Sequence, residues 1–200
     1  IDAQNIMPII KKWLYSDKDI FIREVVSNGC DAITKLRMVD SAAAQGCSIH
    51  VEVDKTAREL RFIDDGVGMT EDEVKTNINQ VAFSGAKSFM EEYAKNEEKE
   101  NSGIIGHFGL GFYSVFMIAD KVTIDTLSFR EGATPVRWES EDGMAFTMTE
   151  GTRTARGTTI TLHVSDEEKE FLETYRVREV RNRYCGYMAV PIYLVDVQDE

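Results

Sequence analysis

The first informative stretch of this sequence reads Asp19-Ile-Phe-Ile-Arg-Glu-Val-Val-Ser-Asn-Gly-Cys-Asp-Ala32. Its apolar residues recur at the three- and four-residue spacing of an amphipathic helix, which we expect to continue to Val39. Within it, Glu24 and Asn28 are four residues apart, and Asp31 follows three residues later. This spacing places the three polar side chains on one face of an otherwise apolar helix. That face is either a solvated stripe or one wall of a binding site.

A second polar motif interrupts a predicted β-hairpin. Residues 48–54 alternate between apolar and polar side chains, and residues 60–63 repeat the pattern after a short turn-like segment. The second strand ends in Asp64-Asp-Gly-Val-Gly-Met69. Two glycines let the backbone come close to a flat ligand while the carboxylate accepts a hydrogen bond. An ordinary Asp-Gly turn would contain the same residues, so the motif is ambiguous by itself.

The remaining elements follow from similar patterns. Thr70-x-x-Glu73 and Ser165-x-x-Glu168 have the spacing of capping boxes and predict helices that begin there, the second reaching about Tyr184. A further helix is expected at residues 5–15, and strands at residues 121–127, 136–140, 144–149, 158–164 and 191–197. Because consecutive strands without crossovers pair mostly antiparallel, we expect an α+β fold. It would be a two-layer sandwich, with helices covering one face of a mixed, mostly antiparallel sheet.

Two glycine motifs complete the pattern. Gly106-His-Phe-Gly-Leu-Gly111 precedes the apolar, helix-like residues 112–119, and free backbone N–H groups ahead of a helix are suited to an anion. This motif is neither the usual phosphate loop nor the dinucleotide fingerprint. Gly157-Thr158 has the weakest individual claim, since threonine favours strands in any case. The charged residues 94–101 are expected to form a mobile surface segment.

Composition limits the possible functions. The 200 residues are 42% hydrophobic and 29% charged, with a net charge of -12, which is typical of a globular domain that repels nucleic-acid backbones and anionic lipid. We therefore expect neither nucleic acid nor a membrane as a partner. No repeat or linker divides residues 1–200, so one domain is expected. The cysteine spacing and the short apolar runs predict a cytoplasmic protein with reduced thiols. Because the chain lacks an initiator methionine, we expect a fragment of a longer protein.

In order, the four motifs resemble the GHKL superfamily, whose Bergerat ATP-binding fold is shared by type II topoisomerases, mismatch-repair ATPases, sensor histidine kinases and the heat-shock protein 90 family. Three further segments, together with the opening stretch, resemble the chaperone branch: Ser84-Gly-Ala-Lys-Ser-Phe89, Ile105-Gly-His-Phe-Gly-Leu-Gly-Phe-Tyr-Ser114 and Trp138-Glu-Ser140. The resemblance covers residues 5–197. It implies the amino-terminal ATP-binding domain of a heat-shock protein 90 family chaperone, with an ATP lid at about residues 80–105. A topoisomerase or mismatch-repair ATPase, or a binding module without hydrolysis, are the alternatives.

The resemblance also implies a role for each site residue. Glu24 corresponds to the general base that orients water, and Asn28 to the one side chain that holds Mg²⁺ beside ATP or ADP. Asp64 corresponds to the acceptor for the adenine amino group, supported by Thr158. The other nucleotide-binding residues implied are Asp31 near the ribose, Gly68, Met69 and Phe112 beside the base, Asn77, and Gly106, Gly109 and Gly111 at the phosphates.

The resemblance implies partners as well. They are client proteins and the chain's own downstream middle domain, in a full-length protein that forms a homodimer. The amino-terminal strand that helps this pairing is missing or short here, so the fragment is expected to be monomeric. In the lid, Phe83 replaces a basic residue and Ala86 a threonine, which puts phosphate contacts from this segment in doubt. We expect slow Mg²⁺-dependent ATP hydrolysis that drives a chaperone's conformational cycle.

Overall fold

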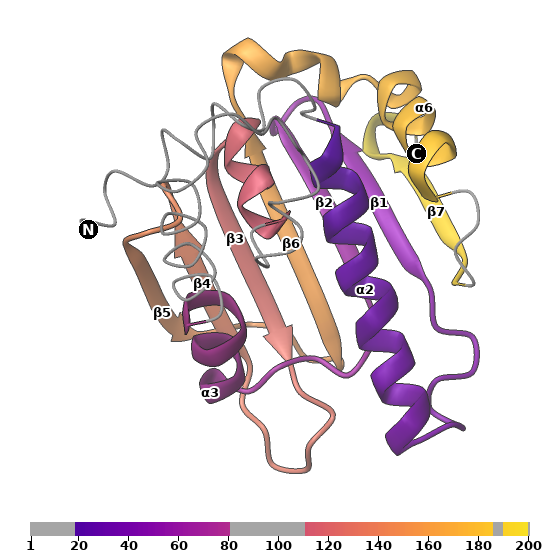
Figure 1. Cartoon of the computed structure of the whole chain (residues 1–200), viewed down its shortest axis with the longest axis vertical. Helices are drawn as coiled ribbons and strands as arrows, with labels where there is room; N and C mark the ends of the chain where they lie inside the picture. Colours follow the sequence, from indigo (N-terminus) through magenta and orange to yellow (C-terminus); the bar gives the residue numbers. More distant parts are fainter. Residues whose placement is uncertain (1–18, 81–110, 186–189, 200) are drawn as a thin grey trace, which may run out of the picture.

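A computed structural model describes residues 19–80, 111–185 and 190–199. In these residues, a seven-stranded sheet has the order β5-β4-β3-β6-β2-β1-β7, and helices lie across one of its faces (Figure 1). Every neighbouring pair is antiparallel except β1 and β7, which run parallel. The predicted α+β architecture with a mixed, mostly antiparallel sheet is confirmed. The predicted helix at residues 5–15, the lid from residue 81 onward and residues 94–101 lie outside the described residues.

All seven strands coincide with a predicted strand to within a residue or two. Their bounds are Ile49–Asp54 for β1, Glu59–Asp64 for β2, Ala119–Leu127 for β3, Val136–Ser140 for β4, Phe146–Glu150 for β5, Gly157–Val164 for β6 and Ile192–Asp196 for β7. Alternation of buried and less buried side chains in β1, β2, β4 and β6 gives these strands one inward face. That inward face is the one on which the helices pack.

The helices match the predictions less uniformly. Helix α2 runs from Ile20 to Val39, as expected. Helix α3, Glu71–Val74, begins with a complete capping box, because Thr70 accepts from the Glu73 N–H and the Glu73 carboxylate accepts from the Thr70 N–H. It continues as the π-helical turn η2, Lys75–Gln80. The helix-like segment after the glycine motif forms the 3₁₀ helix η3, Gly111–Met117, and a short turn η5, Val197–Asp199, follows β7.

The prediction of one capped helix from Ser165 to about Tyr184 is wrong. A 3₁₀ helix η4, Asp166–Leu172, comes first, and no side-chain hydrogen bond from Ser165 caps it. Glu168 leaves helical geometry (φ -115°, ψ 27°) and is buried, and the extended Glu173 separates η4 from helix α6, Thr174–Cys185. Burial of Phe171 and Leu172 against the core therefore decides the local geometry over the capping pattern.

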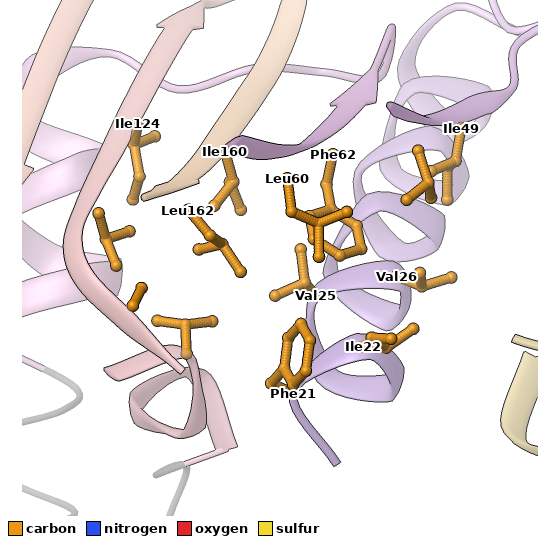
Figure 2. Close-up of a cluster of buried hydrophobic side chains, with 14 of the residues drawn as sticks. Phe21, Ile22, Val25, Val26, Ile49, Leu60, Phe62, Ile124, Ile160 and Leu162 are labelled. Atoms are coloured by element: carbon orange, nitrogen blue, oxygen red, sulfur yellow. The ribbon is translucent and has the colours of Figure 1, made fainter. Parts of the chain in front are cut away.

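The core lies between α2 and the sheet. Figure 2 shows apolar side chains of α2 pointing toward those of β1, β2, β6 and β3. The Phe21 ring packs edge-to-face against Phe62, at 6.4 Å between centroids, and against Phe171, at 5.0 Å. Because the apolar face of α2 packs against the sheet, the polar stripe of α2 lies on a different face of the helix. In the described part of the chain, no helix has both the length and the apolarity to cross a membrane.

Candidate functional site

A cavity of about 630 Å³ opens between α2, the segment after β2 and the inward face of the sheet. Pockets of this size hold small molecules and cofactors. The cavity is lined by most of the residues predicted from sequence: Glu24, Asn28, Asp31, Asp64, Gly68, Met69, Asn77, Phe112 and Thr158. Of the others, Gly106 and Gly109 lie outside the described residues, and Gly111 is the first residue of η3, next to Phe112. The fold thus brings three of the four motifs to one place.

One wall is the polar stripe of α2. Glu24, Asn28, Asp31 and Lys35 all line the cavity, and they follow one another at intervals of four, three and four residues along the helix. The Glu24 side chain is 25% exposed, and its carboxylate accepts a hydrogen bond from Arg23 at 3.3 Å. Asn28, Asp31 and Lys35 are exposed, so the stripe is a wall of the cavity that is open to solvent.

The opposite wall is built on a row of polar side chains on three adjacent strands, of which Asp64 and Thr158 line the cavity. The β2–β6 register pairs Asp64 with Thr158, and the β6–β3 register pairs Thr158 with Thr126. All three residues are buried. The hydroxyl oxygens of Thr126 and Thr158 are 2.8 Å apart, and the Thr126 hydroxyl also donates to the Gly157 carbonyl and accepts from the Met69 N–H. The strand register therefore fixes where Asp64 and Thr158 stand relative to each other.

Asp64 has the most perturbed environment in this wall. Its carboxylate accepts a hydrogen bond from the Gly66 N–H at 2.9 Å. Burial nevertheless raises the pKa of Asp64 to about 7, against smaller lowering effects from the Gly66 hydrogen bond and the Arg153 charge. A ligand that donates a hydrogen bond here would stabilise the carboxylate form. The site is thus suited to a neutral donor such as an aromatic amino group.

Gly68, in the loop after Asp64, lines the cavity, and the local backbone geometry also requires a glycine there. Gly68 has φ +66°, and a Cβ there would lie 1.9 Å from the Leu127 carbonyl oxygen of β3. The loop is joined to its surroundings by hydrogen bonds from the Phe129 N–H to the Val67 carbonyl and from the Val67 N–H to the Ala32 carbonyl. Gly68 therefore approaches β3 closely, at a position that also lines the cavity; its predicted approach to a ligand stays a prediction.

Sequence reasoning missed cavity residues such as Lys35 and Arg130, and also Thr126, which hydrogen-bonds to Thr158 without itself lining the cavity. Lys35 continues the α2 stripe by four residues, so its spacing was a usable signal. Thr126 could be found only from the strand order. Arg130, in the β3–β4 loop, lines the cavity beside Phe129 and lies 3.8 Å from the Glu73 carboxylate, and its sequence context contains no signal for this position. Lys35 and Arg130 place two cations at a cavity whose other charged lining residues, among those described, are acidic.

The donor set fits a magnesium ion only as part of a ligand complex. In the described residues, no group of three or more His, Cys, Asp and Glu side chains could hold a metal by itself. Mg²⁺ commonly keeps several waters and takes phosphate oxygens together with one or two protein ligands. The Asn28 side chain, one helical turn from Glu24 in the cavity wall, offers such a ligand. The residues therefore fit Mg²⁺ that arrives with a phosphate compound.

Comparison with known proteins adds independent findings. A family model described as "Histidine kinase-, DNA gyrase B-, and HSP90-like ATPase" matches residues 19–142. The chain is 43% identical to "Chaperone protein HtpG" of Porphyromonas gingivalis over 197 residues, which are 96% of this chain and 28% of that protein. Proteins of the same name from Bacteroides thetaiotaomicron and Chlorobium phaeovibrioides are 44% and 37% identical, over 96% and 98% of this chain and 28% and 32% of theirs. The chain spans about a third or less of these curated relatives.

Proposed function

Because the chain belongs to the family of histidine kinase-, DNA gyrase B- and HSP90-like ATPases, we propose that its cavity binds ATP and ADP with Mg²⁺ and that bound ATP is hydrolysed slowly. One observation carries the proposal. A buried hydrogen-bonding row at Asp64 and Thr158 and a polar helix stripe at Glu24 and Asn28 face the same cavity. The relatives carry the name chaperone, so we further propose that hydrolysis drives the conformational cycle of a chaperone that assists client proteins.

Recognition of the base is assigned to the sheet wall. The Asp64 carboxylate would accept a hydrogen bond from the 6-amino group of adenine, and Thr158 would support it with its hydroxyl. Met69 and Phe112, which both line the cavity, would contact the faces of the ring. Guanine presents a carbonyl oxygen at the same position, so it would leave the buried carboxylate unsatisfied.

Hydrolysis is assigned to the α2 wall. Glu24 would orient a water molecule and accept its proton at a carboxylate oxygen as the water attacks the terminal phosphate of ATP. Asn28 would hold Mg²⁺ by its side-chain oxygen, and the bound ion supplies positive charge to the phosphate oxygens. Asp31 would lie at the ribose side, with Asn77 also contacting the nucleotide. The predicted phosphate contacts of Gly106, Gly109 and Gly111 are part of the same proposal.

The rest of the proposal concerns the whole protein. We assign it to the cytoplasm, with a middle domain after this chain and a homodimeric full-length state, while the chain alone is monomeric. Hydrolysis by the chain alone is slow in this scheme, because conformational steps that involve other parts of such proteins often limit turnover.

Base selectivity provides the test. Calorimetry and thermal shift should detect binding of ATP and ADP with Mg²⁺ and much weaker binding of GTP. The Asp64→Asn variant should lose the preference, because an amide can present a donor to the adenine amino group. An equal response to ATP and GTP in the unmodified chain would refute the assignment of this cavity.

A further inference from the structure

Two arginines lie behind the sheet wall of the cavity. Arg153 and Arg156 belong to the loop between β5 and β6, and neither is among the residues that line the cavity. Arg153 donates to the hydroxyl of Thr159 at 2.6 Å. Thr159 follows the cavity residue Thr158 along β6, and successive side chains of a strand point to opposite faces. Arg153 is therefore on the face of the sheet that points away from the cavity.

From that face, the Arg153 guanidinium reaches the main chain of Asp64, the residue proposed to recognise the base. Its Nη2 donates to the Asp64 carbonyl at 3.2 Å and to the Arg156 carbonyl at 3.2 Å. A Cβ at Gly157 would lie 2.2 Å from the Asp64 carbonyl oxygen and 2.6 Å from the Arg153 Nη2. Only a glycine leaves room for this contact. The Gly157-Thr158 pair thus serves both faces of β6, with the threonine toward the cavity and the glycine admitting the arginine.

Arg156 holds the next residue in the same way. Its Nε donates to the Asp65 carbonyl at 3.1 Å, and its Nη2 donates to the Ala43 carbonyl at 3.5 Å. The Asp65 carboxylate accepts from the Ser48 N–H at 3.0 Å. Asp64 is the last residue of β2 in register with β6, so the chain leaves the sheet at the point where the two guanidinium groups bind it. Two consecutive carbonyls are thereby fixed by side chains from one loop.

We propose that Arg153 and Arg156 are positioning residues for base recognition. They hold the Asp64–Asp65 main chain from behind, so that the carboxylate keeps the position from which it accepts the 6-amino group of adenine. The inference rests on the proposed function and deepens it. A shift of an ångström in a buried acceptor is enough to lose much of its selectivity, because binding groups act only at close and well-aligned distances.

A pair of ligands separates positioning from general stability. The first is ADP, and the second is the diphosphate of purine riboside, which is ADP without the 6-amino group. Affinities of the 200-residue chain for both are measured by calorimetry at about pH 8, where Asp64, with a pKa of about 7, is mostly ionised. The variants are Arg153→Gln, Arg156→Gln and Arg153→Lys. Arg176→Gln is the matched control, since the Arg176 side chain donates hydrogen bonds to Asp19 and Glu170, outside the Arg153 and Arg156 contacts.

The unmodified chain and the control should prefer ADP by roughly tenfold or more. In Arg153→Gln and Arg156→Gln this preference should fall by about tenfold, while affinity for the purine riboside compound changes by less than about twofold. Arg153→Lys should keep part of the preference, because a single ammonium group can replace only some of the hydrogen bonds of the planar guanidinium. If Arg153→Gln does not fold, Thr159→Val removes one partner of Arg153 and should lower the preference in the same direction.

Failure of the proposed function and failure of this inference alone would give different results. An unmodified chain without any preference for ADP would refute the proposed function and this inference together. A preference that survives in both glutamine variants would refute the inference alone. A parallel loss of affinity for both ligands would also refute it, because that result indicates a general structural role.

Discussion

Lowering the pH from about 8 to about 6 should weaken ADP binding, because the acceptor proposed for adenine is a buried carboxyl group. Burial raises the pKa of Asp64 to about 7. Roughly one-tenth of the group is then protonated at about pH 8 and roughly nine-tenths at about pH 6. Only the carboxylate is a pure acceptor, so affinity should fall by about tenfold, or ~1.4 kcal/mol.

In the ligand-free protein, the effect of pH on stability through Asp64 has the opposite sign to its effect on ADP binding. Because the pKa of Asp64 is higher in the folded protein than the ordinary aspartate value of 3.8, protonation of Asp64 stabilises the folded state. That contribution is fully present below the unfolded pKa and is lost as the pH rises through about 7. Rising pH should therefore reduce the intrinsic contribution of Asp64 to the free energy of unfolding while it increases the stabilisation conferred by ADP.

Calorimetry in buffers of different ionisation enthalpy would count the protons released on binding. The phosphates of ADP titrate in the same range, so the diphosphate of purine riboside, with the same phosphates, serves as the reference. Near pH 6, ADP should release close to one proton more than the reference, and the difference should vanish above about pH 8.5. The Asp64→Asn variant should show no difference at any pH. An equal proton count for the two ligands at pH 6 would refute the role of Asp64.

Three further predictions concern other parts of the site. Glu24→Ala should lower ATP hydrolysis in a full-length protein by about 100-fold or more and leave ADP affinity within a few-fold; loss of ADP binding would instead make Glu24 structural. Gly68→Ala should lower the free energy of unfolding by ~3 kcal/mol or more in urea titrations, because its Cβ would collide with the Leu127 carbonyl. Gly46→Ala, also at positive φ but with open space around it, should cost only ~1 kcal/mol, and equal losses would contradict the steric argument. The chain alone should be monomeric by light scattering, bind ADP at least as well as ATP, and turn over well below ~1 s⁻¹; a stable dimer or faster turnover would contradict this.

The strands and α2 could be predicted because their information is local. A strand with one buried face alternates, and a helix with one buried face repeats every three to four residues, whatever lies opposite. The segment after Ser165 shows where local information ends. Its capping spacing is intact, but buried Phe171 and Leu172 and the departure of Glu168 from helical geometry break it into η4 and α6. Tertiary packing decides the secondary structure of such segments, and a few neighbouring residues in the sequence do not determine that packing.

The site residues also differ in whether local sequence patterns could predict them. Glu24, Asn28 and Asp31 were visible as a helix stripe, and Lys35 could have been found by extending it. Thr126 was not visible, because its place beside Thr158 depends on β3 and β2 flanking β6 in the sheet. Strand order and register are long-range properties that alternation alone does not determine.

The two cavity walls therefore have different physical origins, and this difference separates their proposed roles. The sheet wall is fixed by strand register, by the Thr126–Thr158 hydrogen bond and by two arginines behind Asp64. A rigid acceptor of this kind can discriminate between bases without any other part of the protein. The α2 wall offers exposed or part-exposed polar groups that need a nucleotide and a correctly placed water to act. Base selectivity should accordingly be complete in this chain, whereas the rate of hydrolysis should depend on conformational steps elsewhere in the full-length protein.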